Sequence, residues 1–334
     1  MKILFIRFSS IGDIVLTTSA LKSLIKEIPN AKIHYLTLEE YAPLLEGNSS
    51  IDRLHALERS TSIYNLFSVG NYLNKYNFDM VVDMHDSFRS KIVRNRIKSG
   101  SHFYLKKPRW KRFKLFEFHQ NDFKNDFSQL KLFHSVIKDV LSQKNHSSTS
   151  LFVSENEKEE AKLLLSKNGI KGEQHLVCVP GAGWKNKTWE TEKYLELFKY
   201  FIENRFEIIL LGSKKDVICN DCESGNNSLI NMAGKTDFRQ SLAIISQAKF
   251  VIGSDTGFVH AAEALGIPVV MFLGPTSRET GAGVTKTMSK NIQLSHIWCR
   301  PCSQNGSRPC YRNERYCMNG IQPDTIINQI EEMI

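Results

Sequence analysis

The sequence lacks any long apolar run. No segment approaches the ~20 consecutive apolar residues that a helix needs to cross a bilayer, and Arg7 interrupts the apolar N-terminus too early for a signal peptide. Internal repeats and low-complexity tracts are also missing, and the 41% hydrophobic and 24% charged residues are ordinary for a folded protein. We therefore exclude a disordered, collagen-like or coiled-coil chain. We expect a cytoplasmic protein whose 334 residues form two domains.

Acidic residues are absent from one stretch, which begins at Arg89, ends at Lys114 and contains eleven lysines and arginines. The rest of the chain has 33 basic against 35 acidic residues, so the net charge of +9 arises from this stretch. Aromatic residues are interleaved with it, at positions 103, 104, 110, 113 and 116. Such a stretch attracts polyanions: nucleic acid, anionic lipid headgroups or a phosphorylated substrate. The plain alternative is a solvated basic helix and loop.

Short apolar runs alternate with amphipathic stretches along the whole chain. We expect strands at 2–8, 32–37, 52–57, 78–84, 176–179, 207–211, 250–252 and 269–273. We expect helices at 14–28, 39–45, 64–76, 87–97, 126–142, 155–166, 192–203 and 259–265. A polar segment, 143–150, divides the series and is the expected linker. Strands that alternate with helices form parallel sheets. We therefore expect an α/β protein with two Rossmann-like domains, residues 1–150 and 151–334, facing each other across a cleft.

Ligands of open α/β sheets bind at the loops that follow the carboxyl ends of the strands. The first expected strand leads into Ser9-Ser10-Ile11-Gly12-Asp13. Ser10 and Asp13 have the spacing of a helix-capping pair. Alternatively, Asp13 is a general base that acts on a hydroxyl group. The spacing leaves both interpretations open.

Two loops of the second half are suited to bind phosphate. The first is Pro180-Gly181-Ala182-Gly183 followed by Lys187, where small residues let backbone amides approach an anion and the lysine supplies a positive charge. The second is Gly253-Ser254-Asp255-Thr256-Gly257, which leads into a helix N-terminus. A plain helix cap by Asp255 or Thr256 is the alternative for the second loop. Two such loops facing each other predict a nucleotide diphosphate as the ligand.

Two common nucleotide motifs are incomplete. The G-x-G-x-x-G pattern of nicotinamide dehydrogenases is not completed after Gly181 and Gly183. Gly234-Lys235-Thr236 lacks the upstream glycine of a P-loop, because position 229 is leucine. Both of these enzyme classes are therefore disfavoured.

Four cysteines gather near the C-terminus, at Cys299, Cys302, Cys310 and Cys317, with the spacing C-x2-C-x7-C-x6-C. Four thiolates can form a tetrahedral zinc site, although this spacing is not that of a standard zinc ribbon. Disulfides or redox-active thiols, and inert buried thiols, are the alternatives.

Several segments match one known family in order and spacing. They are Ile6-Arg-Phe-Ser-Ser-Ile-Gly-Asp-Ile-Val, Ile28-Pro-Asn-Ala-Lys-Ile-His-Tyr-Leu-Thr, Phe78-Asp-Met-Val-Val-Asp-Met-His with Arg89-Ser90, Pro180-Gly-Ala-Gly with Lys187-Thr-Trp, Asn231-Met-Ala-Gly-Lys-Thr, and Ser254-Asp-Thr-Gly with His260-Ala-Ala. With this set the chain resembles glycosyltransferase family 9, the ADP-heptose:lipopolysaccharide heptosyltransferases, over essentially its whole length. The four-cysteine segment also resembles many members.

The resemblance implies a GT-B fold, with the acceptor held mainly by the N-terminal domain and the nucleotide sugar by the C-terminal domain. It implies a metal-independent, inverting transfer of heptose from ADP-L-glycero-D-manno-heptose, with Asp13 as the general base. Lys187 and the amides of Thr256 and Gly257 would stabilise the departing diphosphate. Thr236 would lie near the adenosine, and Asp216, where many relatives have Glu, near the ribose. The implied donor-binding residues are Gly181, Ala182, Gly183, Asp216, Thr236, Asp255, Thr256, Gly257 and His260.

The implied acceptor is a phosphorylated, Kdo-bearing lipopolysaccharide core precursor at the inner leaflet, which suits the basic stretch. The aromatic residues would lie at the headgroup level, and Arg89 would bind a carboxylate or phosphate through both arms. The protein would be peripheral at the cytoplasmic face of the inner membrane, with the ADP-sugar as a substrate, no required cofactor and no nucleic-acid partner. The expected acceptor-binding residues are Ser10, Gly12, Asp83, His85 and Arg89.

Other functions compete with this one. A GT-B transferase with another nucleotide sugar or acceptor would share the same motifs. A nucleic-acid-binding protein would use the basic stretch 89–114 and the four cysteines, but it would leave Asp13, Lys187 and the 253–257 loop without a purpose. A sensor would bind the nucleotide sugar without turnover, and an intact Asp13 argues against it.

Overall fold

The structure is a computed structural model that describes residues 1–142, 146–170, 174–223 and 225–333. It forms two compact units, each of which is described by itself. Unit 1 contains Met1–Pro108 and Ser128–Phe152, and unit 2 contains Arg109–Phe127 and the chain from Val153 onward. Of the expected linker, residues 143–145 lie outside the described residues, and residues 146–150 have no regular secondary structure.

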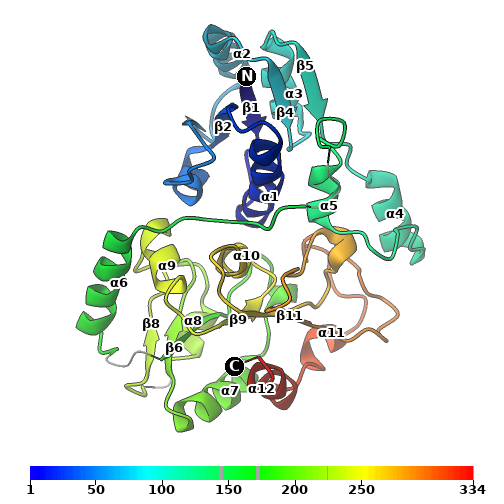
Figure 1. Cartoon of the computed structure of the whole chain (residues 1–334). Coiled ribbons are helices and arrows are strands. Elements are labelled where there is room, and N and C mark those ends of the chain that lie inside the picture. Colours follow the sequence, from blue (N-terminus) through cyan, green and yellow to red (C-terminus); the bar gives the residue numbers. More distant parts are fainter. Residues whose placement is uncertain (143–145, 171–173, 224, 334) are drawn as a thin grey trace. The chain divides into compact units, whose positions relative to one another are not determined.

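Unit 1 alternates strands and helices along the chain (Figure 1). Its strands are β1 (Lys2–Ile6), β2 (Lys32–Leu38), β3 (Arg53–Leu57), β4 (Met80–Asp83) and β5 (Ser101–Tyr104). Its α-helices are α1 (Ile11–Glu27), α2 (Ile63–Leu73), α3 (Phe88–Arg96) and α5 (Gln129–His134), with 3-10 helices η1 (Glu39–Leu45) and η2 (Asn74–Tyr76). Across the described residues the strands form a parallel sheet in the order β3-β2-β1-β4-β5.

Unit 2 repeats this plan with one more strand. Its strands are β6 (His175–Val179), β7 (Glu207–Leu210), β8 (Leu229–Asn231), β9 (Val251–Ser254), β10 (Val269–Phe272) and β11 (Lys290–Ile292). Its α-helices are α4 (Arg109–Phe118), α6 (Glu155–Lys167), α7 (Thr191–Glu203), α8 (Ile218–Asp221), α9 (Phe238–Ile245), α10 (Gly257–Ala264), α11 (Tyr316–Asn319) and α12 (Pro323–Glu331), with 3-10 helices η3 (Lys185–Lys187) and η4 (Arg278–Thr280). The strand order is β11-β10-β9-β6-β7-β8, and every pairing is parallel.

Both orders are those of Rossmann folds, in which the chain runs outward from the first strand and then crosses back to its other side. The expected α/β class with two Rossmann-like domains is therefore confirmed.

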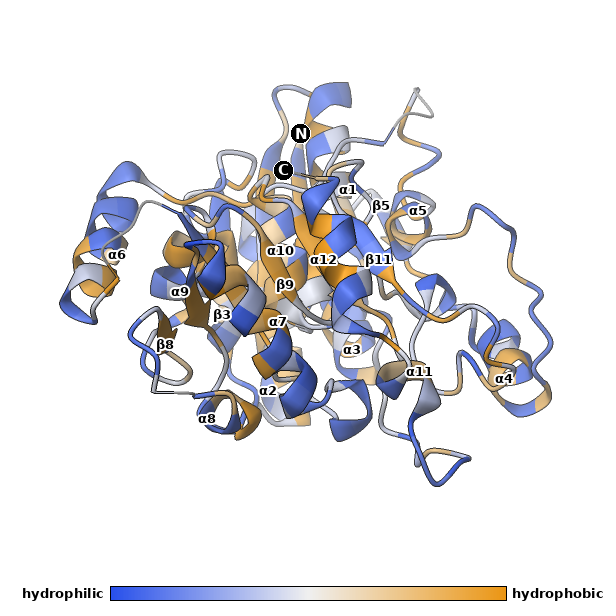
Figure 2. Cartoon of the chain, turned by 90° about the horizontal axis from the view of Figure 1, so that it is seen from below, coloured by the Kyte–Doolittle hydropathy of each residue, from blue (hydrophilic) through white to orange (hydrophobic). Residues whose placement is uncertain are grey.

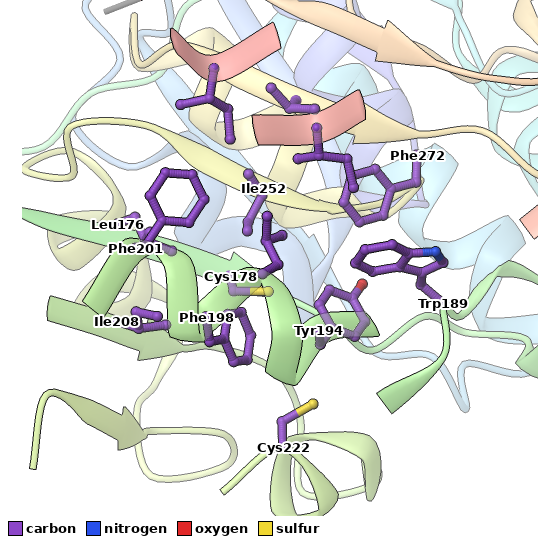
Figure 3. Packing of buried hydrophobic residues seen from close by; sticks show 14 of the residues in the cluster. Leu176, Cys178, Trp189, Tyr194, Phe198, Phe201, Ile208, Cys222, Ile252 and Phe272 are labelled. Atoms are coloured by element: carbon purple, nitrogen blue, oxygen red, sulfur yellow. The ribbon is translucent and has the colours of Figure 1, made fainter. Parts of the chain in front are cut away.

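Buried strands form the core of each unit because parallel sheets are covered on both faces. In unit 1, Leu4 and Ile6 of β1 belong to a buried cluster with Leu66 of α2 and Val93 of α3. In unit 2, Trp189, Tyr194 and Phe272 belong to one buried cluster (Figure 3). The hydropathy of the residues agrees with buried strands: β8 and β9 are hydrophobic, and α6 is mostly hydrophilic (Figure 2).

The division into units differs from the expected one in one segment. The first unit ends at Phe152, two residues beyond the expected boundary, but residues 109–127 leave unit 1 and pack with unit 2. Leu115, Phe116 and Phe123 form a small buried cluster there. Arg112 Nε donates to the Glu279 carbonyl at 3.0 Å, and an Asn121 amide donates to the Glu279 carboxylate at 3.2 Å. These contacts link residues more than 150 positions apart, so local periodicity does not reveal them.

Each expected strand has a counterpart with ends shifted by a few residues, but several elements were missed. Of the expected helix 126–142, only α5 is regular. The missed strands β5, β8 and β11 are three or four residues long and lie at sheet edges. Such short edge strands carry too few side chains to show a hydrophobic period. The missed helices are α4, α8, α9, α11 and α12.

Candidate active site

Each sheet reverses its strand order beside its first strand. In unit 1, β1 lies between β2 and β4, and in unit 2, β6 lies between β7 and β9. Open α/β sheets bind ligands at such a reversal, outside the carboxyl ends of the two strands. The loops after β1 and β4, and those after β6 and β9, are therefore the candidate sites. They contain most of the residues expected from the sequence.

In unit 1, Arg7 organises the loop after β1. Its guanidinium donates to the carbonyl oxygens of Ser9 and Met84, both at 2.6 Å, and pairs with the carboxylate of Asp13. The arginine side chain is only 6% exposed, whereas that of Asp13 is 30% exposed. The buried cation thus orients a carboxylate that solvent still reaches.

The capping alternative for this loop holds only in part. Ser10 occupies the N-cap of α1, but its side chain makes no capping hydrogen bond. Instead its hydroxyl lies 3.4 Å from the carboxylate of Asp13. Gly12 belongs to the first turn of the same helix. Asp13 is held by the ion pair with Arg7, and its side chain remains partly exposed.

The loop after β4 is ordered by Asp83, which is completely buried. Its carboxylate accepts from the backbone N–H of His85 at 2.9 Å and of Asp86 at 3.0 Å, and it pairs with Arg94 at 3.2 Å. Asp83 was expected to contact the acceptor, but its oxygens serve the loop itself. Its role in the structure is to position the backbone around His85.

His85 and Arg89 complete this side of unit 1. Burial, together with the positive charges of Arg7 and Lys107, lowers the pKa of His85 to about 3, so its imidazole is neutral at neutral pH. Its ring packs against Phe8 with centroids 5.3 Å apart. The arms of Arg89 donate to carbonyl oxygens of residues 58, 59 and 61 at 3.0 to 3.4 Å. That guanidinium therefore holds a neighbouring loop, and the expected two-armed grip on an anion is not preformed.

The basic stretch is divided between the two units. Residues 89–108 belong to unit 1, and residues 109–114 belong to unit 2. In unit 1, Arg94 pairs with buried Asp83, and the guanidinium of Arg96 lies 4.6 Å from the ring of Phe67. Several cations that the sequence suggested were free for a ligand therefore stabilise the fold.

In unit 2, Gly181 lies where two loops converge. A Cβ atom at this position would lie 2.3 Å from Cγ of Asp216, so only glycine fits. Asp216 accepts from the backbone N–H of Ser213 at 2.6 Å and from its hydroxyl at 2.8 Å. The loops after β6 and β7 are therefore packed together. Ala182 is half-buried, and Gly183 is exposed with nothing within 4 Å of a built Cβ atom.

Asp255, in the loop after β9, is the centre of the unit 2 site. Lys187 Nζ lies 3.2 Å from its carboxylate and also donates to its carbonyl oxygen. The hydroxyl of Thr276 donates to the carboxylate at 3.0 Å, and His260 Nε2 lies 3.5 Å from it. Burial by itself raises the pKa of Asp255, but Lys187 and His260 outweigh it and hold this pKa well below its usual range. The carboxylate is therefore ionised and fixes the lysine.

The N-terminus of α10 follows directly. Thr256 is its N-cap residue, yet its hydroxyl makes no capping bond and has no hydrogen-bond partner in the described structure. Gly257 begins the helix. The Thr256 side chain therefore does not cap the helix. The first backbone N–H groups of a helix lack partners within the helix, and the helix dipole favours negative charge at this end.

Thr236 lies at the start of another helix, α9. Its hydroxyl is 2.8 Å from that of Ser241, and Asp237 caps the helix by accepting from the backbone N–H of Gln240 at 2.8 Å. Gly234 has a φ of +68°, and a Cβ there would lie 2.2 Å from the side chain of Lys214. This loop follows β8, two strands from β6, and is the outermost of the expected donor-binding positions.

The cysteine-rich segment, residues 299–317, supports the turn that contains Lys187. Asn186 donates to the carbonyl of Arg308 at 2.6 Å, and Arg315 donates to the carbonyls of Lys185 and Thr188 at 2.6 and 2.8 Å. Trp189, two residues after Lys187, is buried, and its indole N–H donates to the Ile321 carbonyl at 3.1 Å. Sequence reasoning missed these supports because their partners lie more than 100 residues away.

The four cysteines themselves are free thiols. Cys299, Cys302 and Cys317 are buried, and burial raises the pKa of Cys302 to about 11. Within the described ranges no group of three or more His, Cys, Asp or Glu residues is arranged to hold a metal ion.

Arg7 and Thr276 are the functional residues that sequence reasoning did not assign. A charged residue inside the apolar run Ile3–Phe8 was a usable signal for Arg7, because a buried guanidinium requires partners. No comparable pattern marks Thr276, whose contact with Asp255 spans 21 residues.

The chain is similar to known proteins over most of its length. The family model described as glycosyltransferase family 9 (heptosyltransferase) matches residues 66–311. The lipooligosaccharide heptosyltransferase 2 of Haemophilus ducreyi is 25% identical, over 100% of this chain and 99% of that protein.

Two solved structures share the fold. The family 9 glycosyltransferase of Veillonella parvula has a TM-score of 0.80 at 18% identity and covers 99% of this chain and 96% of that one. The ADP-heptose lps heptosyltransferase II of E. coli has a TM-score of 0.79 at 21% identity and covers 100% and 98%. The fold is thus GT-B, as expected. Because the family model matches well over half of its residues, the chain belongs to glycosyltransferase family 9, the heptosyltransferases, and is a glycosyltransferase.

Proposed function

We propose that this protein transfers a heptose from ADP-L-glycero-D-manno-heptose to an inner-core lipopolysaccharide acceptor, with inversion at the anomeric carbon. The family and the names of the relatives, which are lipopolysaccharide and lipooligosaccharide heptosyltransferases, support this substrate class. The observation that carries the proposal is the group formed by Lys187, Asp255 and the N-terminus of α10.

Unit 2 binds the donor in this proposal. The Lys187 ammonium donates two hydrogen bonds to Asp255, one to its carboxylate and one to its carbonyl oxygen. A lysine has three N–H donors, so one remains for a phosphate oxygen. The amides of Thr256 and Gly257 add neutral donors to the same diphosphate. The loops at 181–183, 216 and 236 bind the nucleoside, and His260 supports Asp255.

Unit 1 supplies the base. The acceptor hydroxyl loses its proton to the carboxylate of Asp13, and its oxygen forms the new bond to the anomeric carbon. The bond between that carbon and the diphosphate oxygen breaks on the opposite face, so ADP leaves with the bonding electron pair and the configuration inverts. Lys187 stabilises the negative charge that develops on the diphosphate. Arg7 keeps Asp13 in position through the ion pair described above.

The acceptor is an anionic glycolipid, so we place the protein peripherally on the cytoplasmic face of the inner membrane. Among the helices described, none is both long enough and apolar enough to cross a bilayer. Ser10, Gly12 and His85 line the acceptor side. The ADP-sugar is a substrate, and the proposed chemistry requires no metal ion.

Calorimetric titration of the purified protein with ADP, UDP, GDP and a short oligonucleotide tests the donor site. We expect selective binding of ADP, followed by heptose transfer when ADP-heptose and a Kdo-bearing lipid are supplied. Selective binding of UDP or GDP would point to another donor sugar. Tight oligonucleotide binding without any nucleotide binding would overturn the enzyme assignment.

A further inference from the structure

Helix α4 of unit 2 presents aromatic side chains to solvent. Trp110 is 67% exposed, Phe113 43% and Phe118 66%. The rings of Trp110 and Phe113 stack with centroids 5.3 Å apart, and Phe113 meets Phe118 at 5.8 Å. The opposite side of the helix is anchored, because Leu115 and Phe116 are buried. The helix is therefore fixed to unit 2 with its aromatic side outward.

The cysteine-rich segment and the adjoining Trp298 extend this exposed group. The ring of His119, next to Phe118, lies 5.0 Å from that of Trp298 and 6.2 Å from that of Tyr311. Trp298 is 59% exposed and Tyr311 52%. The Tyr311 hydroxyl donates to the Phe116 carbonyl at 3.3 Å, which joins the segment to α4. We call Trp110, Phe113, Phe118, Trp298, Tyr311 and Tyr316 the aromatic surface.

Positive charge surrounds the aromatic surface. Residues 109–124 and 296–316 together contain nine lysines and arginines against three acidic residues. Two of the three acids are neutralised, Glu117 by Arg308 and Asp122 by Lys114. The guanidinium of Arg312 lies 5.6 Å from the ring centre of Trp298 and 5.1 Å from that of Tyr316. Cations are thus interleaved with the exposed rings.

We propose that the aromatic surface docks onto an anionic lipid bilayer, with its rings at the headgroup level and its cations against lipid phosphates. Exposed aromatic rings prefer the interface between water and hydrocarbon, and each nearby lysine or arginine adds attraction to anionic lipid. The excess of positive charge provides the complementarity that selects such a bilayer. The inference rests on the proposed function for the choice of membrane, since a glycolipid acceptor lies in one. It uses none of the residues that bind the donor or carry the chemistry.

The test is sedimentation of the full-length protein with vesicles of phosphatidylcholine, with and without about one third phosphatidylglycerol, and without any acceptor glycolipid. The triple variant Trp110→Ser, Phe113→Ser, Trp298→Ser should lower the partition coefficient on anionic vesicles by about tenfold or more. Its matched control, Leu163→Ser, changes an apolar side chain of α6 in the same unit that is 62% exposed, and should change nothing.

Charge is tested separately. Lys111→Glu should weaken binding at least fivefold, whereas Lys199→Glu on the exposed side of α7 should have little effect. The inference is overturned if wild-type binding to vesicles does not depend on their phosphatidylglycerol content. It is also overturned if the test and control variants lose equal vesicle binding. Tight binding of an oligonucleotide in place of vesicles would overturn it as well.

The two proposals fail in different ways. Calorimetry with ADP on the same variants reports only on the donor site and should give unchanged affinity. A protein that binds ADP and transfers heptose but ignores anionic vesicles refutes the docking surface alone. A protein that binds vesicles through the aromatic surface but neither binds ADP nor transfers heptose refutes the proposed function.

Discussion

The two units reverse their strand order in the same way, yet they offer opposite charges at the reversal. In unit 1 the cation is the buried partner: the side chain of Arg7 is 6% exposed, and that of Asp13 is 30% exposed. In unit 2 the fixed partner is the anion Asp255, which Thr276 and His260 also contact, and it holds Lys187 beside a helix N-terminus. Unit 1 thus presents a carboxylate, and unit 2 presents a cation and backbone N–H groups.

The contrast shows that topology sets the position of each site and that side chains set its chemistry. Topology selects the position, because loops after adjacent carboxyl ends of parallel strands leave room for a ligand at the reversal. In each ion pair, one member is fixed by further hydrogen bonds. The identity of that member decides the chemistry of the site. A tethered arginine leaves a base available, and a tethered aspartate leaves a phosphate-binding cation.

Asp13→Asn should have the largest effect. We expect transfer to fall about a thousandfold, because general-base catalysis typically contributes 10²–10⁴, while the affinity for ADP stays within about twofold. A transfer assay and ADP calorimetry on the same preparation measure both quantities. Ser10→Ala, which removes a hydroxyl 3.4 Å from the same carboxylate, is the control and should cost far less. If Asp13→Asn abolishes ADP binding, the assignment of base and donor site to different units is wrong.

Asp83→Asn should come next, as an effect on stability. The buried pair with Arg94 is broken, which leaves a guanidinium with an 11% exposed side chain unpaired, so unfolding should become easier by about 3 kcal/mol. Urea titration measures this loss. Glu40→Gln breaks the exposed pair with Arg59 and should cost below about 1 kcal/mol. A raised acceptor KM with undiminished stability would instead make Asp83 an acceptor contact.

Lys187→Gln should weaken ADP binding about thirtyfold, since a charge-assisted hydrogen bond contributes about 2 kcal/mol. Lys185→Gln in the same turn is the matched control and should leave the affinity nearly unchanged. Calorimetry decides between them, and equal losses in both variants would remove Lys187 from its proposed role.

The same variant has a pH signature. Because the pKa of Asp255 is lower in the folded than in the unfolded chain, its pairing stabilises the fold fully above pH ~4. That stabilisation is lost as the pH falls through the folded pKa. The stability difference between wild type and Lys187→Gln should therefore shrink in acid below pH ~4.

The last prediction concerns histidines, which the two units use differently. Burial lowers the pKa of six histidines in unit 1 and of His175 in unit 2; the six are His34, His55, His85, His102, His134 and His146. Between the unfolded pKa of 6.5 and a lower folded pKa, the unfolded chain binds more protons, so stability falls as the pH falls.

Unit 1 should therefore lose stability more steeply than unit 2 on acidification from pH ~6.5. His85→Gln should flatten the profile by at most about 1.4 kcal/mol per pH unit, down to its folded pKa of about 3. His296→Gln, at an exposed position of unit 2, is the control. Thermal unfolding followed across this pH range tests the contrast, and parallel profiles for His85→Gln and wild type would refute it.

Local sequence was sufficient for the central strands and for the loops that follow them. Strands such as β1, β4 and β9 are buried on both faces, so they appear as apolar runs, and small or polar residues mark their ends. Local sequence was not sufficient to predict the edge strands β5, β8 and β11. It also did not show that Asp83 and Arg89 bond to backbone groups of their own unit. A charged residue after a strand looks the same in the sequence whether it faces a ligand or the protein's own backbone.

The sequence by itself therefore determined the α/β class, the two Rossmann-like series and the loops that carry Asp13, Lys187 and Asp255, because all of these depend on short-range periodicity. Only the tertiary structure decided that Arg7 bonds to both the Asp13 carboxylate and the Met84 carbonyl, that Lys187 pairs with a carboxylate 68 residues away, and that Trp110 and Trp298 belong to one surface. The reason is physical. Burial and pairing are set by neighbours in space, and in these cases the neighbours come from distant parts of the chain.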